Sequence, residues 1–353
     1  MAFASQIIQW QRVHGRHDLP WQKTRDPYRI WLSEIMLQQT QVTTVIGYYA
    51  RFLARFPDIA TLAAATQEEV MPYWAGLGYY ARARNLHRCA QTLVSDWDGR
   101  FPPSSDLIAT LPGIGPSTAA AIAAFAFDEQ SPIMDGNVKR VFTRHFGIAG
   151  DPSKRPTEQT LWALAHAEVA PADHGVLDMP AYTQGLMDLG ATLCTRRQPA
   201  CSRCPVQTTC VAAREGRQHE LPTPKVKKTA PQRQTTMLLV TQGDAVLMQQ
   251  RPPSGIWGGL MSLPECDVDQ TPLAWADNLG MHVQEAVALA PFEHVFTHFR
   301  LRIEPWVLTL AAPRPEVAAP LRWITQATLA TVAAPAPVRK LLDGMMADDL
   351  LRF

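Results

Sequence analysis

The pattern of apolar and polar positions divides the chain into two parts. From Ser5 to about Ala213, apolar residues recur at spacings of three and four, broken by Pro and Gly, without sustained alternation. This spacing predicts a nearly all-helical first domain over residues 1–213. The individual helices that it predicts include one opening at Ile7, Ile8 and Trp10, a long one over 31–49, and one over 81–97.

The pattern changes after the first domain. Residues 214–234 are rich in Pro and Lys and have no periodicity, which predicts an extended interdomain linker. Beyond it, residues 235–353 predict a smaller α+β domain with short strands and a C-terminal helix. The predicted strands span 235–240 and 245–249 around a Gly243-Asp244 turn, then 299–303 and 306–310, and the helix spans 338–346.

Length and composition agree with this division. A chain of 353 residues suits two domains, and 46% hydrophobic with 18% charged residues is typical of a folded soluble protein. The first ten residues lack an export signal, and the longest apolar stretch, 119–127, is far too short to span a membrane. We therefore expect a cytoplasmic protein. A formal net charge of +1 does not by itself indicate a polyanionic partner, so local motifs must decide whether the chain binds DNA.

Four of the six cysteines lie within seventeen residues and read C-x6-C-x2-C-x5-C: Cys194, Cys201, Cys204 and Cys210. Thiols this close in a chain without an export signal favour a metal site over disulfides. Four soft sulfur donors suit a tetrahedral zinc ion or a [4Fe–4S] cluster, and the wide outer spacings favour iron–sulfur. Three arginines in the same loop predict either a contact with phosphate or a solvated surface: Arg196, Arg197 and Arg203.

The segment 111–117, with the sequence LPGIGPS, joins a short helical segment from Ser105 to an Ala-rich helix. Its two glycines, Gly113 and Gly115, permit a tight turn, and Pro116 suits the first position of a helix. The free N–H groups of such a turn can hold a phosphate, as in a helix-hairpin-helix, although a plain corner between two helices is the alternative.

Two carboxyl groups are candidates for catalysis. Asp135 directly precedes a predicted helix that continues through Phe142, where a side chain that only caps the helix is the simpler interpretation. Glu34 lies among large apolar side chains in WLSEIMLQQT, which would raise its pKa if the carboxyl is desolvated. An exposed face of the helix is the alternative for Glu34.

Taken together, these motifs resemble the endonuclease III type of helix-hairpin-helix glycosylases. Five segments are similar to the adenine DNA glycosylase (MutY) family within it: WLSEIMLQQTQV, GLGYYARARNLH, LPGIGPSTAAAI, MDGNVKR and YTQGLMDLGATLCTRRQPAC. The resemblance covers essentially the whole chain. It implies a [4Fe–4S] cofactor on the four cysteines and duplex DNA containing an A:8-oxoguanine or A:G mismatch as the partner. Nothing in the sequence demands more than a monomer, so we expect a monomeric enzyme.

The resemblance also implies residue roles. Glu34 would be the general acid and Asp135 the carboxylate at the sugar, with Asn137 of the same motif in the catalytic group. Bifunctional relatives carry a lysine where this chain has Ser117, which implies base removal without strand cleavage and an abasic product. Gln39 and Tyr79 would insert into the duplex. The adenine pocket would be lined by Trp21, Gln22, Leu37 and Gln184, although some relatives have Arg and Glu in place of the two glutamines.

The second domain is similar to the MutT-like, Nudix-fold domain of this family. The resemblance rests on RPPSGIWGGLMSLPE over 251–265 and on Phe296-Thr297-His298, a loop that in the family recognises 8-oxoguanine and has Ser in place of Thr297. An active Nudix site needs several Glu residues on one helix to hold Mg²⁺, and only scattered acidic residues follow Leu260. We expect no pyrophosphatase activity.

Three other functions remain open at this point. A glycosylase that removes thymine from G:T mismatches would share the core, although the MutT-like domain argues against it. An iron–sulfur protein that only binds DNA would use Asp135 as a cap and Glu34 as a solvated residue. A nucleotide hydrolase acting through the second domain is disfavoured by the missing acidic helix.

Overall fold

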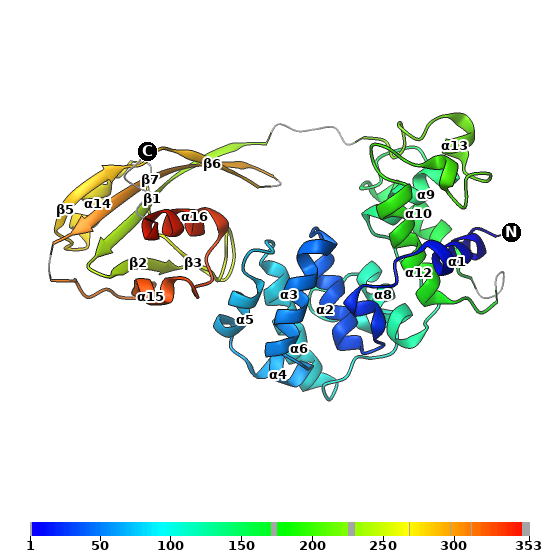
Figure 1. Ribbon diagram of the computed structural model, residues 1–353, viewed down its shortest axis with the longest axis horizontal. Helices are drawn as coiled ribbons and strands as arrows, with labels where there is room; N and C mark the ends of the chain where they lie inside the picture. The colour runs from blue at the N-terminus through cyan, green and yellow to red at the C-terminus, as the bar shows by residue number, and fades with distance from the viewer. Residues whose placement is uncertain are drawn as a thin grey trace. The chain divides into compact units, whose positions relative to one another are not determined.

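The computed structural model describes residues 2–170, 175–224, 230–267, 269–296, 298–311 and 313–347. The chain forms two compact units (Figure 1). A helical unit consists of Met1–Ala65 and Arg84–Val226, and a mixed unit consists of Thr66–Ala83 and Lys227–Phe353. The predicted limits of the domains, 1–213 and 235–353 with a linker over 214–234, stay a prediction.

The helical unit confirms the helix periodicity over its described residues. Its α-helices are α1 (Phe3–His14), α2 (Pro27–Leu37), α3 (Val42–Arg55), α4 (Ile59–Ala64), α6 (Ala81–Asp96), α7 (Ser105–Ile108), α8 (Pro116–Phe127), α9 (Gly136–Phe146), α10 (Arg155–Glu168), α12 (Met179–Asp188) and α13 (Val211–Glu215). Shorter turns are η1 (Pro20–Lys23), the π-helical η2 (Leu189–Leu193) and η3 (Cys201–Arg203). Among the described helices of either unit, none is long and apolar enough to cross a membrane.

The core of the helical unit is built around the Ala-rich helix α8. Its residues Ala119 to Ala124 are all buried, and their small side chains let neighbouring helices approach closely. Helix α8 packs against α2, α7 and α12, while α12 also lies along α1 (Figure 1). The N-terminal helix is thereby brought to residues more than 160 positions later in the chain.

The predicted long helix over 31–49 is wrong. Helix α2 ends at Leu37 and α3 begins at Val42, and Gln39 between them has a left-handed backbone with φ of 58°. A side chain in this region costs about 1–2 kcal/mol. The apolar spacing continues through the break because both α2 and α3 bury apolar side chains, so periodicity alone does not reveal the turn.

The mixed unit contains one sheet in its described part, together with short helices. Its strands are β1 (Gln232–Gln242), β2 (Ala245–Gln250), β3 (Met261–Ser262), β4 (Glu265–Cys266), β5 (Val283–Ala288), β6 (Phe292–Val295), β7 (Arg300–Leu310) and β8 (Leu321–Thr325). Its helices are α5 (Gln67–Trp74), α14 (Pro272–Asn278), α15 (Gln326–Leu329) and α16 (Ala336–Met346).

The sheet confirms the predicted hairpin and corrects another prediction. Strands β1 and β2 pair antiparallel around Gly243, whose φ of 59° suits the turn. The two strands predicted over 299–303 and 306–310 are one continuous strand, β7, which pairs parallel with β1 along ten residues. Pro305, the residue that suggested the interruption, keeps its place in this pairing opposite Met237. The predicted C-terminal helix is confirmed as α16.

Candidate active site

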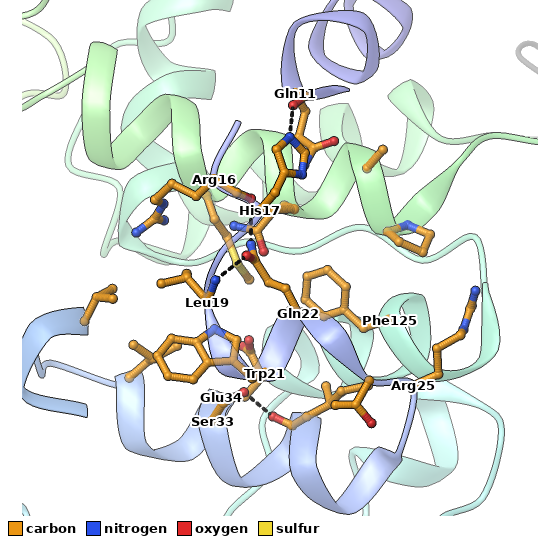
Figure 2. Close-up of a pocket in the computed structure, with 18 of the residues that line it drawn as sticks. Gln11, Arg16, His17, Leu19, Trp21, Gln22, Arg25, Ser33, Glu34 and Phe125 are labelled. Atoms are coloured by element: carbon orange, nitrogen blue, oxygen red, sulfur yellow. Dashed lines mark hydrogen bonds between the residues drawn. The ribbon is translucent and has the colours of Figure 1, made fainter. Parts of the chain in front are cut away.

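A cavity of about 370 Å³ opens into the helical unit (Figure 2). Its volume is in the range of small-molecule sites. The five residues predicted for catalysis or the base pocket that line it are Trp21, Gln22, Glu34, Leu37 and Gln184. These residues come from η1, α2 and α12, so the fold gathers residues from both ends of the helical unit around one cavity.

Glu34 lies on α2 in the wall of this cavity. Burial raises the pKa of its carboxyl to about 8, and the negative charge of Asp135 also contributes to the rise. Both causes disfavour the charged form. A carboxyl with this pKa keeps its proton at neutral pH and is suited to donate it.

Asp135 is the N-cap of α9, where its Oδ1 accepts a hydrogen bond from the Val138 N–H at 2.7 Å. Burial raises the pKa of Asp135, while hydrogen bonds from Val138 and Asn137 N–H groups and the charges of Arg140 and Lys139 oppose the rise. The Asp135 side chain therefore both caps α9 and raises the pKa of Glu34 through its charge.

Ser117 and Asn137 lie beside the Asp135 turn. The Ser117 hydroxyl accepts a hydrogen bond from the Met134 N–H at 2.9 Å, so the first turn of α8 holds the residue before Asp135. Asn137 accepts from Arg140 at 2.9 Å. A side chain on Gly190 would approach the Asn137 Cβ to 2.6 Å, which explains why η2 can pass so close to α9 only with glycine there.

The turn over 111–117 has the predicted local structure. Gly113 has φ of 77°, Gly115 is the N-cap of α8, and Pro116 is its first residue. Both glycines are exposed. A Cβ on Gly113 would also lie 2.5 Å from the Cβ of Asn85 on α6, so the turn requires glycine for two reasons. The N-terminus of α8 can offer its N–H groups to an anion.

The two residues predicted to insert into DNA occupy exposed, strained turns. Gln39 and Tyr79 are both exposed and have φ of 58° and 50°. Sequence reasoning did not find Arg82, whose guanidinium donates to the carbonyls of Leu77 and Gly78 at 3.1 Å each and lies 5.6 Å from the centre of the Tyr79 ring. Arg82 holds the turn on which Tyr79 projects.

An aromatic cluster surrounds the predicted opposite-base loop in the mixed unit. Phe296 stacks on Phe299 with ring centres 4.3 Å apart, and His298 meets Phe299 edge-on at 4.8 Å. Thr297 lies outside the described residues. Trp257 and His294, which sequence reasoning missed, contact Phe296 at 5.7 and 4.7 Å. Trp257 has φ of 55°, so a strained backbone orients this indole.

The four clustered cysteines line one small cavity beside α9 and α13. None forms a disulfide. Arg144 donates to the Cys194 sulfur at 3.3 Å and to the Thr195 carbonyl at 2.7 Å. Among the described residues, no three His, Cys, Asp or Glu side chains converge as a single metal ion requires. The four thiols around this cavity are soft donors of the kind that hold a zinc ion or an iron–sulfur cluster.

Comparisons with known proteins cover both parts of the chain. A model of the HhH-GPD superfamily base excision DNA repair proteins matches residues 32–166, and a model of the NUDIX domain matches residues 235–344. The first match includes Glu34 and Asp135, and the second includes Phe296.

Two individual relatives are similar over 96–97% of this chain. The chain is 32% identical over 348 residues to the adenine DNA glycosylase of Buchnera aphidicola subsp. Acyrthosiphon pisum (strain APS), covering 97% of each protein. It is 32% identical over 408 residues to the adenine DNA glycosylase of Homo sapiens, covering 96% of this chain and 73% of that protein. The solved structure of a thermostable thymine-DNA glycosylase matches with a TM-score of 0.54 and 30% identity, covering 60% of this chain and 95% of that chain.

Proposed function

This chain belongs to the adenine DNA glycosylase family, and on that premise we propose that it removes adenine paired with 8-oxoguanine or guanine in duplex DNA. These comparisons confirm the resemblance that the sequence motifs indicated, and they identify the protein as a DNA glycosylase of base excision repair. The observation that carries the choice of reaction is a cavity lined by a carboxyl, Glu34, whose pKa is raised by burial and by the negative charge of Asp135.

The two carboxyls suit the two charges that develop when a base leaves. Adenine is a poor leaving group as an anion, so protonation by Glu34, at N7 in our proposal, lets it leave neutral. The bond between N9 and C1′ breaks, and the positive charge that develops on the sugar is stabilised by ionised Asp135. Water then adds to C1′, and the proton that it loses restores Glu34. Asn137 keeps its predicted place in the catalytic group, beside Asp135.

We propose that the product is an abasic site in an uncut strand. Strand cleavage by the bifunctional relatives requires a lysine amine, and position 117 offers a hydroxyl that accepts a hydrogen bond from the Met134 N–H. No Schiff base can form on serine. The role of Ser117 is thus to hold the turn that carries Asp135.

Duplex DNA is the proposed partner, held at the α8 N-terminus by the exposed turn of Gly113 and Gly115. Flipping a base out of the duplex costs a few kcal/mol, and Gln39 and Tyr79 are the proposed wedges that fill its place. In this proposal the enzyme works as a monomer in the cytoplasm, on the DNA of the nucleoid.

The thymine-DNA glycosylase of similar fold makes thymine removal the second candidate. Single-turnover assays on four duplexes, with A:8-oxoguanine, A:G, T:G and T:A pairs, separate the two. We expect release of adenine from the first two and no release of thymine. If thymine were released from T:G and no adenine were released from A:8-oxoguanine or A:G, the second candidate would replace our proposal.

The Phe296 loop is the proposed reader of the opposite base. In full-length protein, Phe296→Ala is expected to reduce the ratio of the rate constants on A:8-oxoguanine and A:G by about tenfold, because a stacked aromatic contributes about 1–3 kcal/mol per base. Val295→Ala, which truncates an exposed neighbour, is the matched control. An unchanged ratio in Phe296→Ala would remove this loop from the recognition of 8-oxoguanine.

We propose that Cys194, Cys201, Cys204 and Cys210 hold a [4Fe–4S] cluster. Such a cluster would supply a covalent cross-link that ties the loop 194–210 to the body of the helical unit. Arg144 fits this assignment because its guanidinium, on α9, donates a hydrogen bond to the Cys194 sulfur and so helps to hold this side of the cavity.

The cluster makes a prediction that iron analysis can check. Purified protein is expected to contain about four irons and four acid-labile sulfides per chain, the content that defines a [4Fe–4S] cluster. Cys201→Ser is expected to lose most of both, whereas Cys89→Ser, which changes a buried cysteine of α6, is expected to keep them. One zinc and no iron per chain would mean that the zinc alternative is right.

A further inference from the structure

Helix α12 carries two polar residues one turn apart. Gln184 lines the cavity, and the side chain of Asp188 is 1% exposed. Residues four apart lie on the same face of a helix. The Gln184 Nε2 donates to the Asp188 Oδ1 at 2.8 Å, which connects a group in the cavity wall to a buried carboxylate.

Arg16 also holds the carboxylate of Asp188. The Arg16 Nε donates to Oδ1 at 2.7 Å, and the Arg16 backbone N–H donates to Oδ2 at 2.8 Å. With the bond from Gln184, Asp188 accepts three hydrogen bonds. Because the guanidinium and the backbone amide can only donate, the carboxylate must act as an acceptor throughout.

The second amide in the cavity wall is held by the backbone. The Gln22 Oε1 accepts from the Leu19 N–H at 3.1 Å, and its Nε2 donates to the Arg16 carbonyl at 2.9 Å (Figure 2). Gln22 thereby uses both ends of its amide to hold the segment 16–19. The hydrogen bond to Asp188 uses only the NH₂ group of the Gln184 amide. The Gln184 Oε1 is therefore the atom that can accept a hydrogen bond from a base in the cavity.

We infer that Asp188 is a positioning residue that fixes the Gln184 amide with its oxygen as the acceptor for the base. The amide of a glutamine can rotate by half a turn, which exchanges the positions of its NH₂ group and its oxygen. Asp188 disfavours the rotated state, because the amide oxygen would then face a carboxylate, and neither group has a hydrogen to donate. The fixed acceptor selects a base with an amino group, such as the 6-amino group of adenine, and leaves a base with a carbonyl at that position unpaired. The inference rests on the proposed removal of adenine and adds the residue that sets its selectivity.

The test compares adenine with purine, the same base without its 6-amino group, each opposite 8-oxoguanine. The ratio of their single-turnover rate constants is measured in wild type and in Asp188→Asn, where the new amide can donate to a turned-over Gln184. Dividing one ratio by the other cancels the intrinsic lability of each base. The preference for adenine is expected to fall at least about tenfold in Asp188→Asn, because the loss leaves a polar group unpaired. Equal ratios in the two proteins would overturn the inference.

A second variant keeps the test decisive if Asp188→Asn does not fold. Gln184→Met retains the size of the side chain and removes the amide, so it is expected to lose the same preference. In the Gln184→Met background, Asp188→Asn is expected to change the ratio no further. A preference for adenine that survives in Gln184→Met would also overturn the inference. Wild type that releases no adenine from any pair would instead contradict the proposed function.

Discussion

Glu34→Gln is expected to slow single-turnover release of adenine by about 10²- to 10⁴-fold, the usual contribution of a general acid. The amide has nearly the size of the carboxyl and cannot give up a proton at neutral pH, so the cavity keeps its shape and loses its acid. Affinity for the mismatched duplex is expected to change little. Release of adenine at the wild-type rate would show that another group protonates the base.

In the proposed reaction, the pH dependence of the wild-type rate follows from the two carboxyls. Glu34 has to be protonated, and with a pKa of about 8 its contribution is complete at neutral pH and falls as the pH rises through 8. Asp135 has to be ionised, and because burial raises its pKa, activity falls on the acid side at a higher pH than for an ordinary aspartate. A bell-shaped profile is expected. A rate that stays level between pH 7 and pH 10 would contradict the role of Glu34.

Glu316→Gln is the control for Glu34. It makes the same change at an exposed position of the mixed unit. It is expected to leave the rate constant and its pH profile as in wild type, so a loss in both variants would point to the preparation rather than to the acid.

Asp135→Asn is expected to reduce adenine release by on the order of 10³-fold. A carboxylate about 4 Å from a unit positive charge contributes on the order of 4 kcal/mol at an effective dielectric near 20, and each 1.4 kcal/mol is tenfold in rate. Asparagine caps a helix about as well as aspartate, so α9 keeps its start at Gly136. Duplex binding is therefore expected to persist.

The chain provides a matched control for this substitution. Asp58 caps α4 by accepting from the Thr61 N–H, as Asp135 caps α9, but Asp58 is exposed. Asp58→Asn is expected to leave adenine release unchanged. If Asp135→Asn also released adenine at the wild-type rate, with its melting temperature unchanged, Asp135 would be only a cap.

Local patterns predicted most helices and the hairpin because burial on one face dictates spacing. The break between α2 and α3 was missed because the apolar positions continue through it, and their spacing does not encode the left-handed backbone of Gln39. At Pro305 we predicted a break between two strands where the structure has one continuous strand. The strand continues because its pairing with β1 along ten residues outweighs the effect of one proline.

The candidate residues were identifiable where a motif carried them, as for Glu34 and Asp135. Their supporting residues were not. The role of Asp188 depends on Arg16, 172 positions earlier, and that of Trp257 depends on the rings of a loop near residue 296. Sequence spacing contains no information on such contacts, because only the packing of α1 on α12 and of one loop on another creates them.

The most direct test of the account is adenine release from an A:8-oxoguanine duplex under single-turnover conditions, followed with and without hot alkali. We expect wild type to give strand breaks only after alkali, which reveals abasic sites, and Asp135→Asn to give almost none. Strand breaks without alkali would contradict the proposal that the enzyme, with Ser117 where its bifunctional relatives have a lysine, leaves the strand uncut. If wild type carries the proposed cluster, binds the duplex and releases no adenine, the central claim is contradicted and the protein only binds DNA.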